Sequence, residues 1–190
     1  MILCVKPMEE RLNKIRSFAE HAHGDQMRRY SDEKYIRHPE RVMELCREHT
    51  QDHTILAAAL LHDVLEDTEV TEQEIASFLI EVMETYEAER TVRLVVDLTD
   101  IYIKKDYPHL NRKKRKRKEA ERLGKAHPDA QTVKYADIID NTVDLAENDE
   151  DFARVFLKEA QLILSKMHDG HPGLRKKARE TVEHYSSLVF

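Results

Sequence analysis

Residues 60–68, Leu-Leu-His-Asp-Val-Leu-Glu-Asp-Thr, place four side chains that bind metals or move protons at the end of an apolar segment. His62 and Asp63 are neighbours, and Glu66 and Asp67 follow closely. Residues four apart share one face of a helix, so His62 is expected above Glu66. Asp63 is expected above Asp67 for the same reason. Soluble proteins rarely set so many ionisable groups beside a core segment without using them, and the run therefore predicts a functional site.

Two further residues complete a set of metal-binding groups. His38 precedes His62 by 24 residues, which is enough for one antiparallel helical hairpin. Asp137 lies in the apolar stretch 133–139, where an unpaired carboxylate is costly. With His62 and Asp63, these residues give two imidazoles and two carboxylates from three helices. Such a mixed nitrogen and oxygen set suits a transition or borderline divalent ion, with positions left for water or substrate.

The composition favours an all-α fold, which we expect to be a single helical-bundle domain over residues 1–190. Gly (4) and Pro (5) are scarce among the 190 residues, Trp is absent, and 36% of the residues are charged. Helix-forming residues such as Ala, Leu, Glu and Lys are abundant. A chain of this length suits one domain with a sizeable core, and we find no internal repeat.

Apolar periodicity, caps and prolines predict where the helices lie. Segment 55–61 is apolar nearly all round, which is typical of a central buried helix, and Gln51 or Asp52 can cap it. Thr71 and Glu74 have capping-box spacing, and Asn111 can cap a highly charged helix. The predicted helices are 8–23, 38–49, 55–61, 71–79, 87–98, 111–124, 128–145, 149–167 and 174–185.

The same sequence argues against several classes of protein. No apolar run approaches the roughly 20 residues that span a bilayer, and no signal peptide precedes the first charged residues. The two cysteines, Cys4 and Cys46, indicate free thiols in a reducing cytoplasm. A net charge of −6 argues against nucleic-acid binding by the whole surface. The oligomeric state stays open, and a homo-oligomer is compatible with the sequence.

Five segments, in this order, resemble the hydrolase domain of RelA/SpoT-type enzymes and the stand-alone small alarmone hydrolases. Both groups belong to the HD-domain metal-dependent phosphohydrolases. The resemblance extends from about residue 20 to residue 145, ahead of C-terminal helices at 149–185. The matching segments are 22–29 (AHGDQMRR), 35–39 (YIRHP), 58–68 (AALLHDVLEDT), 97–99 (DLT) and 133–141 (VKYADIIDN).

The resemblance implies an all-α HD fold that binds one Mn²⁺, or another divalent transition metal. The implied ligands are His38, His62, Asp63 and Asp137. It also implies that Glu66 and Asp67 handle the attacking water. Physical reasoning agrees, because a metal lowers the pKa of bound water from about 15.7 toward 7, and a nearby carboxylate can then take the proton. The alternative is an ordinary charged helix end, although acidic groups at a helix C-terminus are mildly unfavourable.

Substrate-binding residues are expected on both sides of this set. Lys134 and Asn141 share a helix face with Asp137 and could contact a bound nucleotide, although Lys134 could instead pair with a carboxylate of the metal site. Arg28 and Arg29 occupy the loop in which the alarmone hydrolases carry an Arg-Lys pair near the substrate. Arginine offers forked donors that match phosphate, and solvated loop charge is the alternative.

Residues 112–118 are seven consecutive basic residues. Removing these seven from the 31 basic residues leaves 24 against 37 acidic residues, a net charge of −13, so the run is a local positive patch. Nucleic-acid binding or nuclear localisation is one interpretation. An exposed helix with some residues at the rim of the pocket is the interpretation that we favour. Arg112, at the helix start, is the first candidate to reach a substrate.

The reaction implied by the resemblance is hydrolysis of the 3′-diphosphate of guanosine-3′,5′-bis(diphosphate) (ppGpp) or pppGpp, which releases pyrophosphate. Three departures from the family concern the substrate more than the chemistry: a loop between Gln26 and His38 that is one residue longer, Asp100 in place of a common lysine, and an unusual segment 107–112. Two alternatives therefore remain. One is a phosphatase of another nucleotide, such as a nucleoside monophosphate or NADPH. The other is a catalytically silent HD domain that senses nucleotides.

Overall fold

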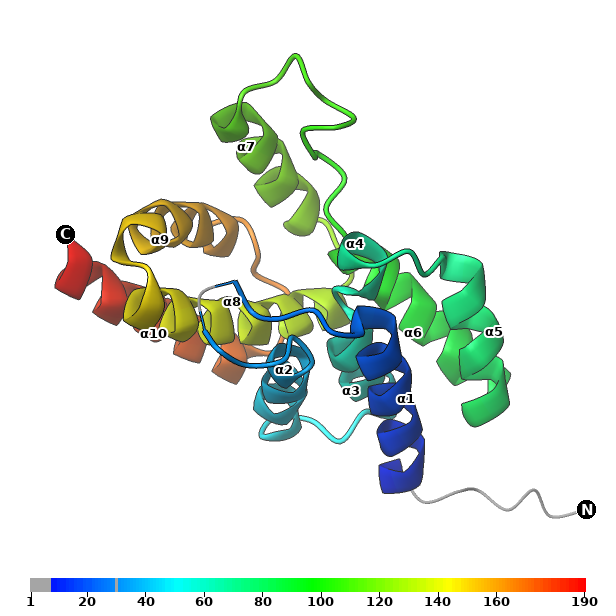
Figure 1. Cartoon of the computed structure of the whole chain (residues 1–190). Helices are drawn as coiled ribbons and strands as arrows, with labels where there is room; N and C mark the ends of the chain where they lie inside the picture. Colours follow the sequence, from blue (N-terminus) through cyan, green and yellow to red (C-terminus); the bar gives the residue numbers. More distant parts are fainter. Residues whose placement is uncertain (1–7, 30) are drawn as a thin grey trace, which may run out of the picture.

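The computed structural model describes residues 8–29 and 31–190, and within them the chain forms ten helices and no strand (Figure 1). Cys4 lies outside the described residues. The helices are α1 (Met8–His23), α2 (Arg37–Arg47), α3 (His53–Leu61), α4 (Val64–Asp67), α5 (Glu72–Val82), α6 (Thr85–Leu98), α7 (Arg112–Leu123), α8 (Pro128–Asn148), α9 (Glu150–Leu164) and α10 (Pro172–Val189). The predicted all-α class is confirmed.

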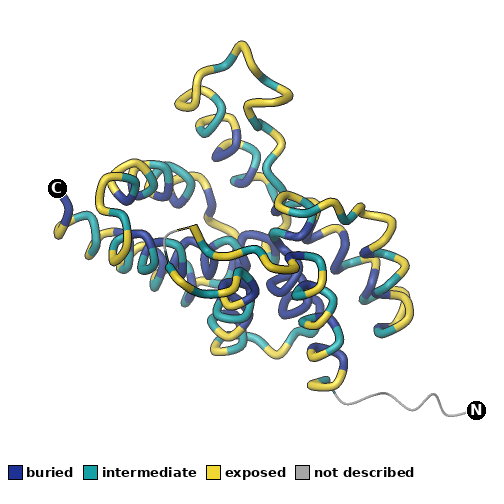
Figure 2. The backbone as a smooth tube through the Cα atoms, viewed as in Figure 1, coloured by how far each residue is buried: buried dark blue, intermediate teal, exposed yellow. Residues whose placement is uncertain are grey.

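The central buried helix is α3. Every residue from Thr54 to Leu61 is buried, and the helix packs against α1, α2, α6 and α8 (Figure 2). Its N-terminus is capped by Asp52, whose carboxylate accepts a hydrogen bond from the Thr54 amide at 2.9 Å. The short side chains of residues 57–59, all alanine, let neighbouring helices approach closely. The end of α3 is therefore fixed in the middle of the molecule.

Helix α3 ends at Leu61, as predicted, but the helix does not continue directly into the residues that follow. The predicted stacking of His62 over Glu66 assumes one continuous helix, but α3 ends at Leu61 and α4 begins at Val64. His62 and Asp63 form the turn between them. The Asp67 amide still donates to the Asp63 carbonyl at 2.9 Å, so these two residues keep their helical relation. The interruption lets His62 face α2 and α8 instead of following the α3 axis.

The longest helix, α8, runs through the molecule and contacts α2, α3, α6, α9 and α10 (Figure 1). Gly170, between α9 and α10, approaches it closely. A Cβ atom added at Gly170 would lie 2.6 Å from the Tyr135 ring and 2.8 Å from the Thr132 amide nitrogen. Only glycine fits at this distance, so the last helix can cover the middle of α8.

Local capping signals account for most helix boundaries. The capping box of Thr71 and Glu74 starts α5, and Asn111 caps α7, both as predicted. Helix α10 begins earlier than predicted because the His171 side chain accepts from the Gly173 amide. It also continues beyond residue 185, to Val189. Among the described residues, no helix combines the length and the apolar character needed to cross a lipid bilayer.

Two connecting segments border the site described below. The first, residues 24–36, leaves α1 through Gly24, whose φ of 55° is a conformation that glycine adopts readily. In the described part of this segment, Met27 and Lys34 form an isolated antiparallel bridge. The second, residues 99–111, projects from the body together with α7 (Figure 1).

Candidate active site and metal centre

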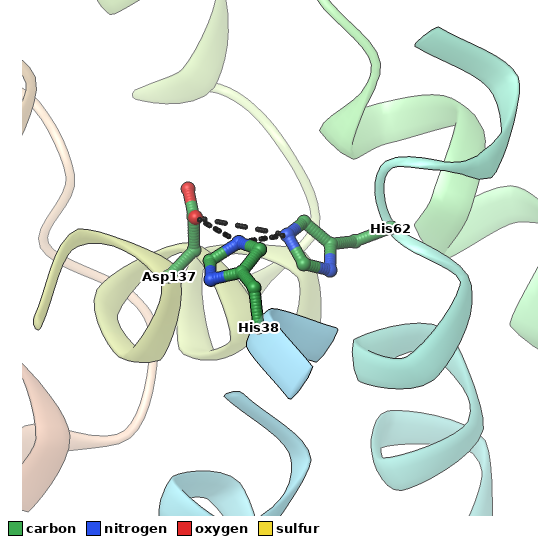
Figure 3. A group of neighbouring side chains, drawn as sticks. All are labelled: His38, His62 and Asp137. Carbon is green, nitrogen blue, oxygen red and sulfur yellow. Dashed lines mark hydrogen bonds and ion pairs between the residues drawn. The ribbon is translucent and has the colours of Figure 1, made fainter. Parts of the chain in front are cut away.

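Three helices bring the predicted metal ligands together. His38 lies in the first turn of α2, His62 directly follows α3, and Asp137 lies midway along α8. Figure 3 shows the three side chains pointing toward one another. All three are buried, with 1% of His38 and 2% of His62 exposed. Their ligand atoms lie within 4.8 Å of one another.

The separations are short and similar. The Nε2 atoms of His38 and His62 are 3.2 Å apart. Asp137 Oδ1 lies 3.2 Å from the first and 3.6 Å from the second. Asp63 Oδ2 lies 3.4 Å from His38 Nε2 and 3.2 Å from His62 Nε2. We call these four residues the donor cluster.

The hydrogen bonds of the two Nδ1 atoms determine whether each Nε2 atom carries a proton or a lone pair. His62 Nδ1 lies 2.8 Å from the Ala59 carbonyl oxygen, which only accepts, so Nδ1 carries a proton. His38 Nδ1 lies 2.7 Å from the carboxylate of Asp140, and the same reasoning applies. In neutral rings both Nε2 atoms are then lone-pair acceptors, and they face each other beside two carboxylates. Such an arrangement needs a cation or protons at its centre.

The protonation of the two rings agrees with this requirement. Burial alone lowers the pKa of His38, but hydrogen bonds with Asp137, Asp140 and Asp63 outweigh it and raise the pKa to about 9. Burial likewise opposes the charged form of His62, yet the adjacent Asp63 and Asp137 raise its pKa to about 10. Without a metal, the donor cluster therefore holds protons where a cation would otherwise lie.

The donor cluster fits a divalent metal. Ligand atoms about 2.1 Å from a central ion lie about 3.0 Å apart when adjacent in an octahedron and about 3.4 Å apart in a tetrahedron. The separations among His38, His62 and Asp137, and those from Asp63 to the two histidines, are 3.2–3.6 Å and are close to these values. Two imidazoles with two carboxylates are a donor set for a transition metal rather than for a purely oxygen-bound ion.

Tyr35 is a site residue that the sequence reasoning did not single out. Its hydroxyl lies 2.7 Å from Asp63 Oδ2 and 2.7 Å from Asp67 Oδ2. One hydroxyl proton is thus shared between a donor-cluster residue and an acid of the cavity. Burial, followed by the charges of the two acids, raises the pKa of Tyr35, so the hydroxyl stays protonated. His23 stacks on the Tyr35 ring at 4.5 Å between centroids.

Glu66 and Asp67, the acid pair, lie beside the donor cluster. The Glu66 carboxylate accepts from the Asp100 amide at 3.2 Å. Removal of this carboxyl group from bulk water, together with repulsion from Asp100, raises its pKa to about 7. Partial shielding of the Asp67 carboxyl group from water, followed by the nearby Asp63, also raises the pKa of Asp67, although both residues of the acid pair are exposed. A carboxyl group that titrates near neutrality can both accept and release a proton at physiological pH.

A cavity of about 260 Å³ opens next to the donor cluster. Its wall combines acids, cations and apolar side chains from α4, α7, α8 and α9. The chemically active lining residues are Tyr35, Asp63, Glu66, Asp67, Asp100, Arg112, Lys116, Lys134, Asp137 and Asn141. The aromatic residues Phe152 and Phe156 also line the cavity. The cavity thus has room for a phosphate group and an adjoining apolar surface for a ring.

The cations of the cavity each have a carboxylate partner. Lys134 Nζ lies 2.7 Å from Asp137 Oδ2, which is the pairing that the sequence offered as the alternative for this residue. Arg112 makes two bonds to Glu159, at 2.6 and 2.8 Å. Of the basic run, Arg112 and Lys116 line the cavity, whereas residues 113, 114, 117 and 118 are exposed elsewhere on α7.

Arg28 and Asn141 form a pair at the edge of the site. Asn141 donates to Asp137 at 2.6 Å and accepts from Arg28 at 2.9 Å. Arg28 also binds Asp144 at 2.6 Å, and its side chain is 8% exposed. It does not line the cavity, and neither does Arg29, which is exposed on segment 24–36. Arg28 therefore reaches the site through Asn141.

Asp140 is the second residue that the sequence reasoning missed. Only 8% of it is exposed, and it contacts His38 from the side opposite the other donors. Arg41 binds both of its carboxylate oxygens, at 2.6 and 3.2 Å. The signal that could have found Asp140 is its position three residues after Asp137, on nearly the same face of a buried helix.

The donor cluster and its helical frame can now be compared with known proteins. Residues 16–167 match the HD domain family, which is most of the chain. The chain belongs to the HD domain family. The HD domain also resembles a solved structure described as a metazoan orthologue of SpoT that hydrolyses ppGpp. That likeness has a TM-score of 0.77 at 22% identity, and it covers 95% of this chain and 97% of the other.

Curated relatives of the HD domain are named guanosine-3′,5′-bis(diphosphate) 3′-pyrophosphohydrolases. The Mus musculus protein MESH1 is 35% identical over 131 residues, which are 67% of this chain and 65% of that protein. The Aquifex aeolicus protein is 38% identical over 92 residues, which are 48% of this chain but 12% of that protein. The matched segment thus spans less than two thirds of these relatives.

Proposed function

We propose that this HD domain is a metal-dependent pyrophosphohydrolase that removes the 3′-diphosphate of ppGpp or pppGpp. The observation that carries the proposal is the composition of the cavity: the two carboxylates of the donor cluster, Asp63 and Asp137, a carboxyl group with a pKa near 7 and three cations line one space of about 260 Å³. The 35% identity to a mouse protein named for this reaction supports the substrate.

The donor cluster would hold one divalent metal ion, for which we propose Mn²⁺ because two imidazoles and two carboxylates suit such an ion. When bound, the ion supplies positive charge and lowers the pKa of water in the site. Lys134 neutralises the outer oxygen of Asp137 at 2.7 Å, which keeps Oδ1 directed at the cluster. The Asn141 side-chain amide donates a hydrogen bond to Asp137 Oδ1 at 2.6 Å.

The acid pair handles the proton of the attacking water. In the overall reaction, water adds to the phosphorus bonded to the 3′ oxygen, the bond between that phosphorus and the 3′ oxygen breaks, and the 3′ oxygen gains a proton. Glu66 is suited to take the proton from water because a general base is most effective when its pKa lies near the working pH. Asp67, hydrogen-bonded to Tyr35, orients the water.

The cations of the cavity bind the phosphate groups of the substrate. Arg112 and Lys116 are paired with Glu159 and Asp100, and an incoming polyphosphate offers stronger acceptors that can replace those carboxylates. The planar guanidinium of Arg112 matches two phosphate oxygens. We assign Arg28 to holding Asn141 in place, and Arg29 to extending the positive charge of segment 24–36 toward the nucleotide.

The enzyme is proposed to work in the cytoplasm as a single HD domain. The buried cysteine Cys46 is a free thiol, which is compatible with a reducing compartment. The proposed partner of the protein is a small nucleotide, and neither nucleic acid nor a membrane takes part in the proposed reaction.

Product analysis tests this function. Mn²⁺-loaded protein is incubated with ppGpp beside nucleoside monophosphates and NADPH, and the products are separated by anion-exchange chromatography; a chelator-treated sample is the control. Pyrophosphate and GDP from ppGpp, with little turnover of the other compounds, support the proposal. Inorganic phosphate from another nucleotide would keep the chemistry and replace the substrate. No turnover of any compound by metal-loaded protein would favour a sensor.

A further inference from the structure

A chain of hydrogen bonds and ion pairs runs from His38 of the donor cluster through Asp140 and Arg41 to Glu33. His38 Nδ1 lies 2.7 Å from Asp140 Oδ2, and Asp140 is buried on α8. Arg41, one turn after His38 on α2, binds Asp140 Oδ1 at 2.6 Å and Oδ2 at 3.2 Å. Glu33, in segment 24–36, holds Arg41 in turn at 2.8 Å. None of Glu33, Arg41 and Asp140 lines the proposed catalytic cavity.

The Nδ1 atoms of the two histidines in the donor cluster have different hydrogen-bond acceptors: a carbonyl for His62 and a carboxylate for His38. His62 Nδ1 donates to the neutral carbonyl of Ala59, in the last turn of the preceding helix α3. His38 Nδ1 faces a carboxylate that comes from a different helix and is fixed by a two-point contact with Arg41. A charged acceptor makes the opposite nitrogen of an imidazole a stronger metal ligand, and it also fixes the ring's tautomer and orientation.

We propose that Asp140, clamped by Arg41, is a positioning residue that holds His38 in the Nδ1–H tautomer and thereby sets the metal affinity of the donor cluster. The inference rests on the proposed metal site. It goes beyond that site because it assigns a function to a pair of residues that touch neither the substrate cavity nor the metal position. A salt bridge that only joins α2 to α8 would affect stability and leave metal affinity unchanged.

Metal titration separates these two roles. The dissociation constant for Mn²⁺ is measured by calorimetry at 25 °C for the unsubstituted protein and for Asp140→Asn. Asparagine keeps the size and an acceptor oxygen but removes the negative charge. We expect Mn²⁺ affinity to fall by about 10- to 100-fold, the range typical for partners of ligating histidines. The measurement does not depend on turnover.

A matched control comes from the same helix. Asp129 also lies on α8 and pairs with an arginine, Arg90, at 2.5 Å, but it makes no contact with the donor cluster among the described interactions. Asp129→Asn therefore removes a charge from a comparable ion pair. We expect it to lower the melting temperature and to leave the Mn²⁺ dissociation constant within about twofold, since its partner lies outside the metal site.

Arg41 provides a second test, because its side chain is 37% exposed and its replacement should be tolerated in folding. Arg41→Gln should weaken Mn²⁺ binding by about three- to tenfold, and Arg41→Lys should recover part of the loss. Unchanged Mn²⁺ affinity in the folded Asp140→Asn or Arg41→Gln variant overturns the positioning role alone. Failure of the unsubstituted protein to bind any divalent transition metal overturns the metal site and this inference together.

Discussion

The two sides of the proposed catalytic cavity are built in different ways. On one side, the donor cluster is held by α2, α3 and α8, and both of its histidines are almost completely buried. On the other side, Arg112 lies on the projecting helix α7, with half of its side chain exposed and one carboxylate partner on α9. The contrast is between a fixed interior set and an adjustable exterior set.

The difference matches what each side has to do. A metal site requires ligand atoms placed within about 0.5 Å, and close packing with buried hydrogen bonds provides that precision. Phosphate recognition by long, exposed side chains tolerates rearrangement because ion pairs at the surface are weak, typically about 0–1 kcal/mol. We therefore expect substitutions on the interior side to abolish the chemistry, and those on the exterior side to change substrate affinity.

Replacing an interior ligand should have the largest effect. His62→Ala removes one of the two imidazoles, so we expect loss of bound metal and a fall in kcat of at least about 10³, which corresponds to several kcal/mol of stabilisation by the metal. The melting temperature measured with Mn²⁺ should fall as well, because a ligand that binds the folded state stabilises it. His184→Ala, at an exposed histidine of α10, is the control. Unchanged metal content by elemental analysis would exclude the proposed site.

The acid pair should separate chemistry from metal binding. The double variant Glu66→Gln, Asp67→Asn keeps the shape of both side chains and removes their charge. We expect kcat to fall by about 10²- to 10⁴-fold, the usual contribution of acid–base groups, while metal content stays the same. Glu69→Gln, at a neighbouring exposed acid, is the control. Retained turnover in the double variant would remove both residues from the mechanism.

The pH profile sharpens the assignment of the base. Because the pKa of Glu66 is raised to about 7, its carboxylate form predominates above that pH and is lost below it. The rate should therefore fall about tenfold for each pH unit below 7, and Glu66→Gln should remove this dependence. The same acidic limb in Glu66→Gln would assign it to another group.

Sequence reasoning performed well where structure follows from local signals. The caps at Thr71, Asn111 and Asp52 and the apolar face of α3 each depend on neighbouring residues, and the structure confirms them. The predicted end of α3 is right, but the stacking expected for His62 over Glu66 is wrong, because it assumed a continuous helix through residues 62–66. What interrupts the helix is a requirement of the folded protein, namely that His62 faces α2 and α8.

The missed site residues share one property. Arg41 and Asp140 are 99 positions apart, and Tyr35 is 28 and 32 positions from its two acceptors. The packing of α2 against α8 brings Arg41 to Asp140, whereas Tyr35 meets Asp63 and Asp67 because segment 24–36 lies against the turn after α3 and against α4. The donor cluster was accessible from sequence because its residue types are unusual at buried positions.

Substitutions on the exterior side should change affinity rather than turnover. A charge-assisted hydrogen bond contributes about 1.5–3 kcal/mol, but Arg112 already has Glu159 as a partner, so its exchange for phosphate yields the lower end of that range. We expect Arg112→Ala to raise KM about tenfold and to leave kcat within about twofold. Lys113→Ala, on an exposed part of α7 outside the cavity, should change neither. A loss in kcat alone would place Arg112 in the chemical step.

The smallest effect is expected for substitutions of Asp52, which lies at the N-terminus of α3, whereas His62 follows its C-terminus. Asp52 caps this helix through the Thr54 amide and also binds Arg90 at 2.8 Å. Asp52→Ala should lower the free energy of unfolding by about 1 kcal/mol, the usual value of a cap. Asp52→Asn should cost less, because asparagine caps equally well and only the partly buried ion pair with Arg90 is lost. Urea denaturation of the metal-free protein measures both changes.

The stabilisation of the folded state by the Asp52 carboxylate should be lost at low pH. Burial opposes the charge of Asp52, but hydrogen bonds from Thr54 and Arg90 outweigh it and lower its pKa. The carboxylate therefore stabilises the folded state above the unfolded pKa of about 3.9, and this stabilisation disappears as the pH falls through the lower folded value. Asp52→Asn should abolish that part of the acid dependence while kcat and metal content stay unchanged. A parallel loss of metal would mean that the interior side is less rigid than its burial indicates, because a frayed start of α3 would then affect His62, which lies ten residues, or roughly 15 Å of helix, beyond the cap at position 52.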